Sequence, residues 1–206
     1  MPPLSPWLER WWSQRRTPQL QFGSGRTAVR LPAEREAQFV LISGPARCGK
    51  TRRVVANLGH WSGSAVVIDR EGETARATAR ERRGLGGQVA YLEASEDGQW
   101  PRIDGAGLLE RPTTLYLLVR RTTPQLGGVL LDLVRALWDR MELGETTPRV
   151  PVAVFLDGVL DPVEVPLIEL AREVRAVRGG GLLLLAYIPT LDRWSSASAE
   201  MVCSNC

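Results

Sequence analysis

The chain has 206 residues, of which 44% are hydrophobic and 24% are charged, with a formal net charge of +3. This composition predicts a globular protein with one sizeable core and excludes collagen-like, low-complexity and disulfide-framework classes, since only three cysteines are present. No apolar run approaches the ~20 residues of a membrane-spanning helix, and the first residues form no secretory signal, so we predict a cytoplasmic protein without a membrane-spanning segment.

Residues 1–36 are predicted to form an N-terminal extension that leads into the main domain, residues 37–206. The extension carries Trp11 and Trp12 beside Arg15 and Arg16, followed by a Gly-Ser-Gly turn at 23–25 that is typical of a small hairpin. The tryptophan pair fits a membrane interface, a partner protein or the chain's own core. These three alternatives stay open on the sequence.

Short apolar runs alternate with helical stretches from residue 39 onward, which predicts βαβ units and a mostly parallel sheet flanked by helices. Each run is β-branched or leucine-rich throughout, as expected of strands covered on both faces. The predicted strands are 39–43, 65–69, 89–92, 114–119, 152–157 and 181–188. Helices are predicted over 129–141, where apolar residues recur at helical spacing, and over 163–177, which a run of three glycines ends. The fold class is therefore α/β.

The residues after the first predicted strand fit Gly-x-x-x-x-Gly-Lys-Thr, the P-loop pattern that binds the phosphates of a nucleoside triphosphate. They are Gly44, Pro45, Ala46, Arg47, Cys48, Gly49, Lys50 and Thr51. The glycines allow backbone N–H groups to surround phosphate oxygens, and the following helix presents its positive end to the anion. Lys50 is the only lysine among 26 basic residues, and it stands where a compact ammonium is needed. The alternative is a glycine-rich turn that fits the pattern by chance.

A magnesium site is predicted from the end of a second apolar strand, 152–157. P-loop NTPases hold Mg²⁺ with the loop hydroxyl, here Thr51, and with an acid at such a strand end, here Asp157. Lys50 and Asp157 are therefore the candidate catalytic residues. The alternative is that Asp157 only caps the segment that follows. Many P-loop ATPases have a glutamate directly after this aspartate, whereas Gly158 follows here, so the usual general base is absent.

Further acids have two interpretations each. Asp69, Glu71 and Glu73 follow a predicted strand, where they would orient water or ribose or would stabilise a helix N-terminus. Asp161 is a candidate to replace the missing base, although Asp-Pro also begins turns.

Four arginines share one predicted helix, where they would contact DNA, contact a neighbouring subunit's nucleotide, or form a solvated face with Glu81. They are Arg76, Arg80, Arg82 and Arg83. The pair Cys203 and Cys206 has metal-ligand spacing, but no second pair accompanies it, so zinc is not predicted.

The order of these motifs resembles the TraG and TraD type of conjugation coupling proteins, inner-membrane ATPases that feed DNA to type IV secretion channels. The resemblance extends from about residue 38 to 206 and includes a strand that ends in an Asp-x-x-Gly-Glu turn at 69–73. The similar segments are 39–51, 63–73, 112–119, 179–191 and 194–205.

This resemblance implies a RecA-like P-loop fold that binds ATP and Mg²⁺. It also implies a homo-oligomer, a hexameric ring in relatives, that acts with DNA and secretion-channel proteins at the inner face of the cell membrane. Gly158 and Pro189 replace polar residues of the family, so hydrolysis is predicted to be impaired. The relatives' membrane-spanning N-terminus and inserted all-α domain are missing, which predicts a minimal or truncated relative. The alternatives are a non-catalytic nucleotide-binding or assembly module and a DNA-binding fragment.

Overall fold

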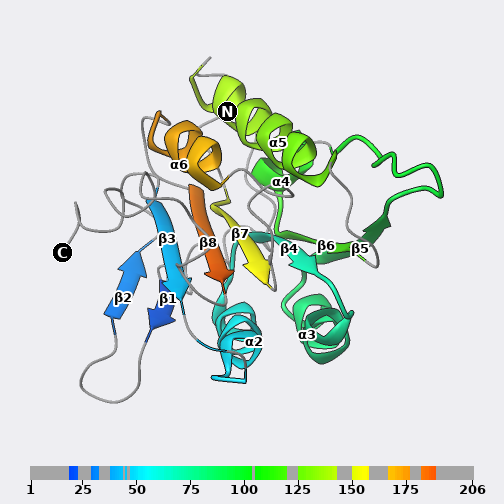
Figure 1. Ribbon diagram of the computed structural model, residues 1–206. Helices are drawn as coiled ribbons and strands as arrows, with labels where there is room; N and C mark the ends of the chain where they lie inside the picture. Colours follow the sequence, from blue (N-terminus) through cyan, green and yellow to red (C-terminus); the bar gives the residue numbers. More distant parts are fainter. Residues whose placement is uncertain are drawn as a thin grey trace.

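The computed structural model (Figure 1) describes residues 19–22, 29–32, 38–43, 45, 47–103, 105–119, 125–142, 150–157, 167–176 and 182–188. Its strands are β1 Gln19–Phe22, β2 Val29–Pro32, β3 Gln38–Ser43, β4 Ser64–Asp69, β5 Gln88–Glu93, β6 Thr113–Leu118, β7 Val152–Asp157 and β8 Leu182–Ile188. Its helices are α2 Lys50–His60, α3 Glu73–Gly84, α4 Gly105–Glu110, α5 Gln125–Glu142 and α6 Leu167–Ala176. The predicted strands and the two predicted helices are all present, with ends that differ by a few residues.

Six strands form one parallel sheet in the order β3-β8-β7-β4-β6-β5. Because the strands are parallel, their carboxyl ends meet at one edge of the sheet, and the arrows of β3, β8 and β7 point toward this edge in Figure 1. Strand β8 lies between β3 and β7 and pairs with both. The structure thus confirms the predicted α/β class, with helices on both sides of a parallel sheet.

The helices divide between the two faces of the sheet. Figure 1 shows α2 and α3 below the sheet and α4, α5 and α6 above it. Side chains alternate between faces along a strand, so Val66 and Ile68 of β4 pack toward α5, whereas Ala65 and Val67 pack toward α2 and α3. Both faces of β4 and β7 are fully buried.

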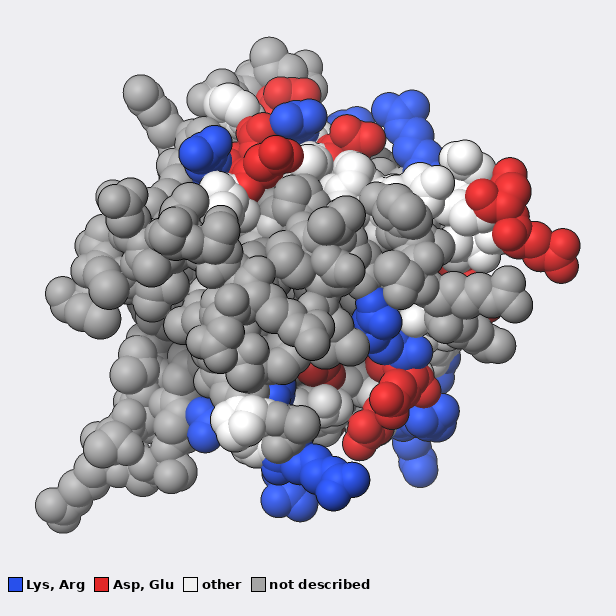
Figure 2. Space-filling view, in the orientation of Figure 1, with Lys and Arg blue, Asp and Glu red and all other residues white. Residues whose placement is uncertain are grey.

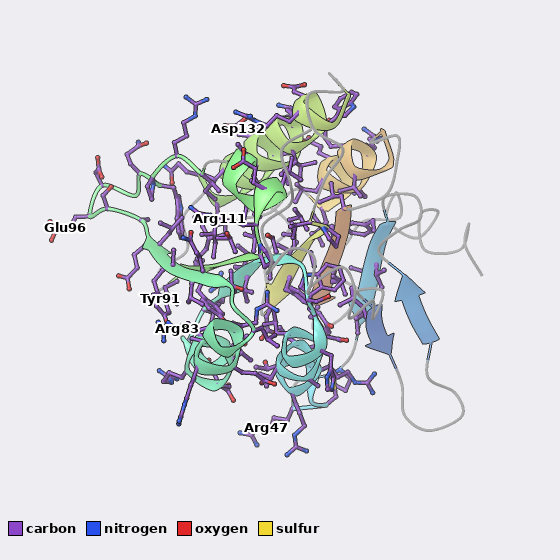
Figure 3. All side chains as sticks on the ribbon, turned by 180° about the vertical axis from the view of Figure 1, so that it is seen from behind. Arg47, Arg83, Tyr91, Glu96, Arg111 and Asp132 are labelled. Atoms are coloured by element: carbon purple, nitrogen blue, oxygen red, sulfur yellow. The ribbon has the colours of Figure 1, made fainter. Side chains whose placement is uncertain are left out.

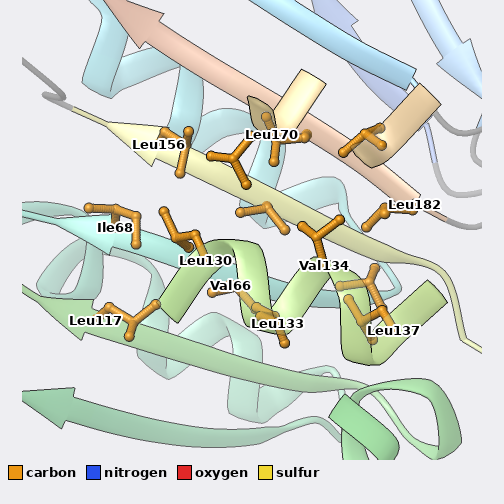
Figure 4. Close-up of a cluster of buried hydrophobic side chains, with 14 of the residues drawn as sticks. Val66, Ile68, Leu117, Leu130, Leu133, Val134, Leu137, Leu156, Leu170 and Leu182 are labelled. Carbon is orange, nitrogen blue, oxygen red and sulfur yellow. The ribbon is translucent and has the colours of Figure 1, made fainter. Parts of the chain in front are cut away.

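Helix α5 contributes the largest apolar stripe to the upper face (Figure 4). Leu130, Leu133, Val134 and Leu137 recur at helical spacing and are at most 2% exposed. They pack against strand residues of β4, β6, β7 and β8. Burial of one such side chain contributes about 1.5–3 kcal/mol, so packing is what holds α5 on the sheet.

Below the sheet, α3 packs closely because its inner face is built from small residues. Ala75 and Ala79 belong to the same buried cluster as Val54 and Leu58 of α2. Leu20 of the two-stranded antiparallel pair β1–β2 is also fully buried in this cluster, and β1 contacts α2. The division of the chain into an extension and a main domain stays a prediction.

Two features differ from the expectations. Strands β3 and β5 are only partly buried, because they are the two edge strands of the sheet, and Tyr91 on β5 is 45% exposed. The short helix α4 was not predicted. Between β5 and β6 the described residues contain α4 as their one helix. No helix in the described ranges combines the length and apolar character that crossing a bilayer requires.

Candidate phosphate-binding site

The loop between β3 and α2 has an unusual backbone. Gly49, which precedes the first residue of α2, has a φ of 86°, and Arg47 has a φ of 62°. A left-handed arginine is strained by roughly 1–3 kcal/mol, and such residues gather at ligand-binding turns. Alternating left- and right-handed residues turn successive N–H groups toward one point, which forms a concave anion site.

A glycine is needed at position 49 because of the left-handed backbone conformation, and not because a side chain would lack room there. A Cβ atom built at this position would meet no atom of the described residues within 4 Å. The left-handed φ of Gly49 is therefore the reason for a glycine at this position.

Lys50 begins α2 and folds back over the loop. Its Nζ atom donates a hydrogen bond to the Pro45 carbonyl oxygen at 2.7 Å and lies 3.6 Å from Cys48 Sγ. The Cys48 backbone N–H also donates to the Pro45 carbonyl, at 3.4 Å. The ammonium group is thus held inside the loop, where an anion bound by the loop would meet it.

The surroundings of the loop are basic. Arg47, Arg52 and Arg53 are exposed, and the first turn of α2 contains no acid. Figure 2 shows basic side chains gathered over α2, and Figure 3 shows Arg47 projecting at this end of the molecule. This positive potential favours an anionic ligand.

Asp157 at the end of β7 is 7% exposed and meets the hydroxyl group of Thr51. Burial raises the pKa of the Asp157 carboxyl, and the hydrogen bond with Thr51 opposes this rise. Thr74 Oγ1 also donates to Asp157 Oδ2, at 3.4 Å. Asp69 adds to the rise in the pKa, because β4 and β7 are neighbours and end at the same edge. The fold therefore brings together Thr51 and Asp157, which are distant in sequence.

Asp69 has a different hydrogen-bond partner from Asp157. Its Oδ2 atom accepts a hydrogen bond from the backbone N–H of Ala75 at 2.8 Å, in the first turn of α3. This is the helix-terminus role that the sequence offered as one interpretation of this acid. Glu71 and Glu73 are exposed, and Glu73 lies close enough to raise the pKa of Asp157.

Tyr187 is a site neighbour that the sequence did not reveal. It pairs with Asp157 across β7 and β8, and its side chain is fully buried. Burial raises the pKa of Tyr187 to about 12, so the ring stays neutral beside the carboxyl group. It is the one residue of β8 with a polar side-chain atom, which was the available signal.

The arginines of α3 do not form one face. Arg76, Arg80 and Arg83 are exposed, whereas Arg82 is 1% exposed and turned into the protein. The interpretation of all four as a contact surface is therefore wrong for Arg82.

Several predicted residues lie outside the described residues: Gly44, Ala46, Gly158, Asp161, Pro189, Cys203, Cys206, Trp11 and Trp12. Among the described residues no group of three or more His, Cys, Asp or Glu side chains is arranged to hold a metal ion. A hydroxyl and one carboxylate fit Mg²⁺ better, since this ion keeps several waters and takes phosphate oxygens as its other ligands.

The parallel sheet, the loop after β3 and the acids at the ends of β4 and β7 define the chain as an α/β domain. The family model for conjugative DNA transfer by the type IV secretory system matches residues 10–100, which confirms the predicted resemblance to conjugation coupling proteins. No curated protein matches the chain. Among solved structures, the chain is similar to the pCW3 conjugation coupling protein TcpA in its monomer form with ATPγS, at 12% identity and a TM-score of 0.45. This similarity covers 85% of the chain and 49% of that protein, so the chain spans about half of its length.

Proposed function

We propose that the chain binds MgATP at the loop 44–51 and serves conjugative DNA transfer as a coupling ATPase or as part of one. The observation that carries this proposal is the meeting of Thr51 and Asp157 beside a loop that has two left-handed residues. The family match over residues 10–100 supports the biological role.

Each part of the site has a role in this proposal. The backbone of 44–49 surrounds the phosphates, and Lys50 neutralises their charge. Thr51 and Asp157 hold Mg²⁺, which would shield the charge that develops on the phosphate oxygens. The ionised form of Asp157 is the one that binds the ion, so a pH low enough to protonate this buried carboxyl weakens Mg²⁺ binding.

The proposed assembly is a homo-oligomer with the nucleotide between subunits, working on DNA beside the secretion channel at the cytoplasmic face of the membrane. This part follows from the family resemblance. A neighbouring subunit would then supply an arginine to the phosphates, as in other phosphoryl-transfer sites.

A second candidate function is a nucleotide-binding module that does not hydrolyse ATP. The residue after Asp157 is Gly158, so no side chain stands at the position of the usual general base. Such a module would use ATP to stabilise an assembly, because a ligand that binds only the folded state stabilises it by mass action.

The test is equilibrium binding of a fluorescent ATP analogue with and without Mg²⁺, with phosphate release measured on the same samples. Lys50→Ala is expected to weaken binding at least tenfold, since it removes the charge inside the loop. Arg52→Ala is the matched control, because it removes an exposed charge from the same helix. Equal losses in both variants, or no binding by the folded wild type, would reject the phosphate site.

Phosphate release decides between the two functions. Release that depends on Lys50 establishes an ATPase, whereas binding without release favours the non-catalytic module. In the latter case Gly158→Glu is expected to raise turnover by ~10²- to 10⁴-fold, the usual contribution of a positioned base.

A further inference from the structure

Asp69 is the second buried acid at the carboxyl ends of the strands, and it lies beside Asp157. Strands β4 and β7 are neighbours in the sheet (Figure 1), and their pairing extends to the residues just before these two acids. Val67 and Phe155, two residues earlier on each strand, belong to the buried cluster on the side of α2 and α3. Because side chains alternate along a strand, both carboxyl groups are on this same side of the sheet.

Hydrogen bonds fix the position of Asp69. Its carbonyl oxygen accepts a hydrogen bond from the backbone N–H of Val119 at 3.1 Å, and its Oδ2 atom accepts one from the backbone N–H of Ala75 at 2.8 Å. Thr74, the residue before Ala75, donates to Asp157. The first turn of α3 therefore holds the two carboxyl groups in a defined relative position.

The other carboxyl oxygen of Asp69, Oδ1, is an unused acceptor. Within the part of the chain that the structure describes, the hydrogen bond of the carboxyl group is the one at Oδ2, and no salt bridge accompanies it. Asp69 is 3% exposed, whereas Glu71 and Glu73 in the same turn are exposed. Asp69 is thus the acid of this turn that combines a fixed position with a free hydrogen-bond acceptor.

The sheet order places Asp69 at a useful distance from the loop 44–51. Thr51 of the loop meets Asp157 at the end of β7, and Asp69 is at the end of the next strand. Neighbouring strands are about 4.8 Å apart. One water that accepts and donates hydrogen bonds spans about this length, because each bond is about 2.7–2.8 Å long. A water beside the Asp157 carboxyl group can therefore contact Asp69 as well.

We propose that Asp69 orients the water that attacks the terminal phosphate of a nucleoside triphosphate, a task for which Gly158 offers no side chain. This assignment rests on the proposed function, because it needs a triphosphate bound at the loop 44–51. Oδ1 accepts a hydrogen bond from the water, which directs a lone pair of the water oxygen toward the phosphorus. The water oxygen then bonds to phosphorus, the bond from phosphorus to the bridging oxygen breaks, and the water proton passes to Oδ1 and on to solvent. The products are a nucleoside diphosphate and inorganic phosphate.

The experiment measures phosphate release at saturating ATP and equilibrium binding of a fluorescent ATP analogue, both with the full chain and Mg²⁺. Asp69→Asn keeps an oxygen that accepts the hydrogen bond from Ala75 but removes the basic carboxylate. We expect it to slow phosphate release by ~10²- to 10⁴-fold, the usual contribution of a positioned base. Affinity for the analogue is expected to stay within about threefold of the wild type, since Asp69 is not part of the loop.

Two variants separate this role from a structural one. Asp69→Ala removes both oxygens, so we expect it to slow phosphate release as much as Asp69→Asn and also to lower the urea midpoint of unfolding, because α3 loses an acceptor at its first turn. Glu71→Gln is the matched control, because it neutralises an exposed acid of the same turn, and it is expected to change phosphate release by less than about twofold. If Asp69 only stabilised α3, Asp69→Asn would release phosphate like the wild type while Asp69→Ala would not.

The two measurements also separate this assignment from the proposed function. A folded wild type that does not bind the analogue rejects the triphosphate site, and the role of Asp69 with it. Binding without phosphate release leaves the triphosphate site in place and overturns the role of Asp69 alone. The role is also overturned if Asp69→Asn releases phosphate at the wild-type rate, or if Glu71→Gln loses as much activity as Asp69→Asn.

Discussion

Two buried charged side chains, Arg82 and Asp157, lie at opposite ends of the strands of the same sheet, which we call its amino edge and its carboxyl edge. They differ in how completely the protein itself satisfies their hydrogen bonds. Helix α3 reaches both: its first turn contacts Asp157 through Thr74, and its last turn carries Arg82. At the amino edge the charge is satisfied within the protein. At the carboxyl ends of the strands, Asp157 meets the hydroxyl groups of Thr51 and Thr74, and burial still raises its pKa.

Arg82 has a hydrogen-bond acceptor for each of its nitrogens. Nε donates to Thr114 Oγ1 at 2.8 Å, Nη2 donates to the carbonyl of Gly63 at 2.6 Å, and Nη1 donates to the carbonyls of Leu58 and Trp61. Three of these acceptors lie at or just beyond the C-terminus of α2, where carbonyls lack partners within the helix. Burial lowers the pKa of Arg82 to about 10, so it stays charged at neutral pH.

Asp157 is less completely satisfied. The hydrogen bond from Thr74 is long, at 3.4 Å, and burial outweighs the hydrogen bonds in setting the direction of the pKa shift. The comparison teaches that burial of a charge does not by itself mark a functional site. We expect a functional site where an incompletely compensated charge lies at the carboxyl ends of parallel strands, because ligands of open α/β folds bind there.

The largest expected effect is at Arg82. Arg82→Ala leaves a cavity and buried carbonyls without donors, and we expect it to lower the free energy of unfolding by roughly 3–5 kcal/mol. Urea unfolding followed by circular dichroism measures this. Arg80→Ala, on the exposed side of the same helix, is expected to cost below about 0.5 kcal/mol. A small loss of stability in Arg82→Ala would contradict the comparison with Asp157, because it would mean that the hydrogen bonds of Arg82 do not stabilise the fold.

A smaller loss is expected where the same amino edge is tightly packed. A Cβ atom at Gly63 would lie 2.3 Å from the Pro151 carbonyl oxygen, so Gly63→Ala forces the backbone apart. We expect a loss of about 1–3 kcal/mol in unfolding experiments, the usual cost of overpacking. At Gly84 the same substitution meets no atom of the described residues within 4 Å, and Gly84→Ala is expected to be neutral or slightly stabilising. Equal effects at both glycines would show that the amino edge is not rigid.

The sequence predicts the strands well because most of them are short apolar runs in a sheet covered on both faces. It also places Asp157 at a strand end and the loop 44–51 before a helix. Strand order is not encoded locally, so neither the exposed edge strand β5 nor the pairing of Asp157 with Tyr187 could be predicted. Helix α4 begins Gly-Ala-Gly, a poor helix former, and is therefore hard to detect.

The inward position of Arg82 could have been predicted from the sequence. Ala75, Thr78 and Ala79 share its helical face, with spacings of seven, four and three residues, and all are buried. Small residues on a helix face indicate close packing, and an arginine on that face must then find acceptors inside. Three of the acceptors lie 19 to 24 residues earlier in the chain and the fourth, Thr114, lies 32 residues later, so only the tertiary structure shows them.

The smallest expected effect has the opposite sign and tests the carboxyl edge. Because burial raises the pKa of Asp157, the folded state holds its proton more tightly than the unfolded state does. Stability from this group is therefore present at low pH and is lost as the pH rises from the ordinary carboxyl range through the raised pKa. Asp157→Asn removes that loss, so we expect the variant to gain roughly 0.5–2 kcal/mol at pH 7, the usual range for a stabilising substitution at a functional site.

Urea unfolding of Asp157→Asn and the wild type between pH 5 and 8 measures this gain, which is expected to grow with pH. Asp132→Asn on the exposed surface of α5 (Figure 3) is the control and is expected to show no such trend. Binding of the ATP analogue should meanwhile lose its dependence on Mg²⁺ in Asp157→Asn. A variant that is less stable than the wild type at pH 7 would mean that the protein itself satisfies the Asp157 carboxylate, and the two edges of the sheet would then be alike.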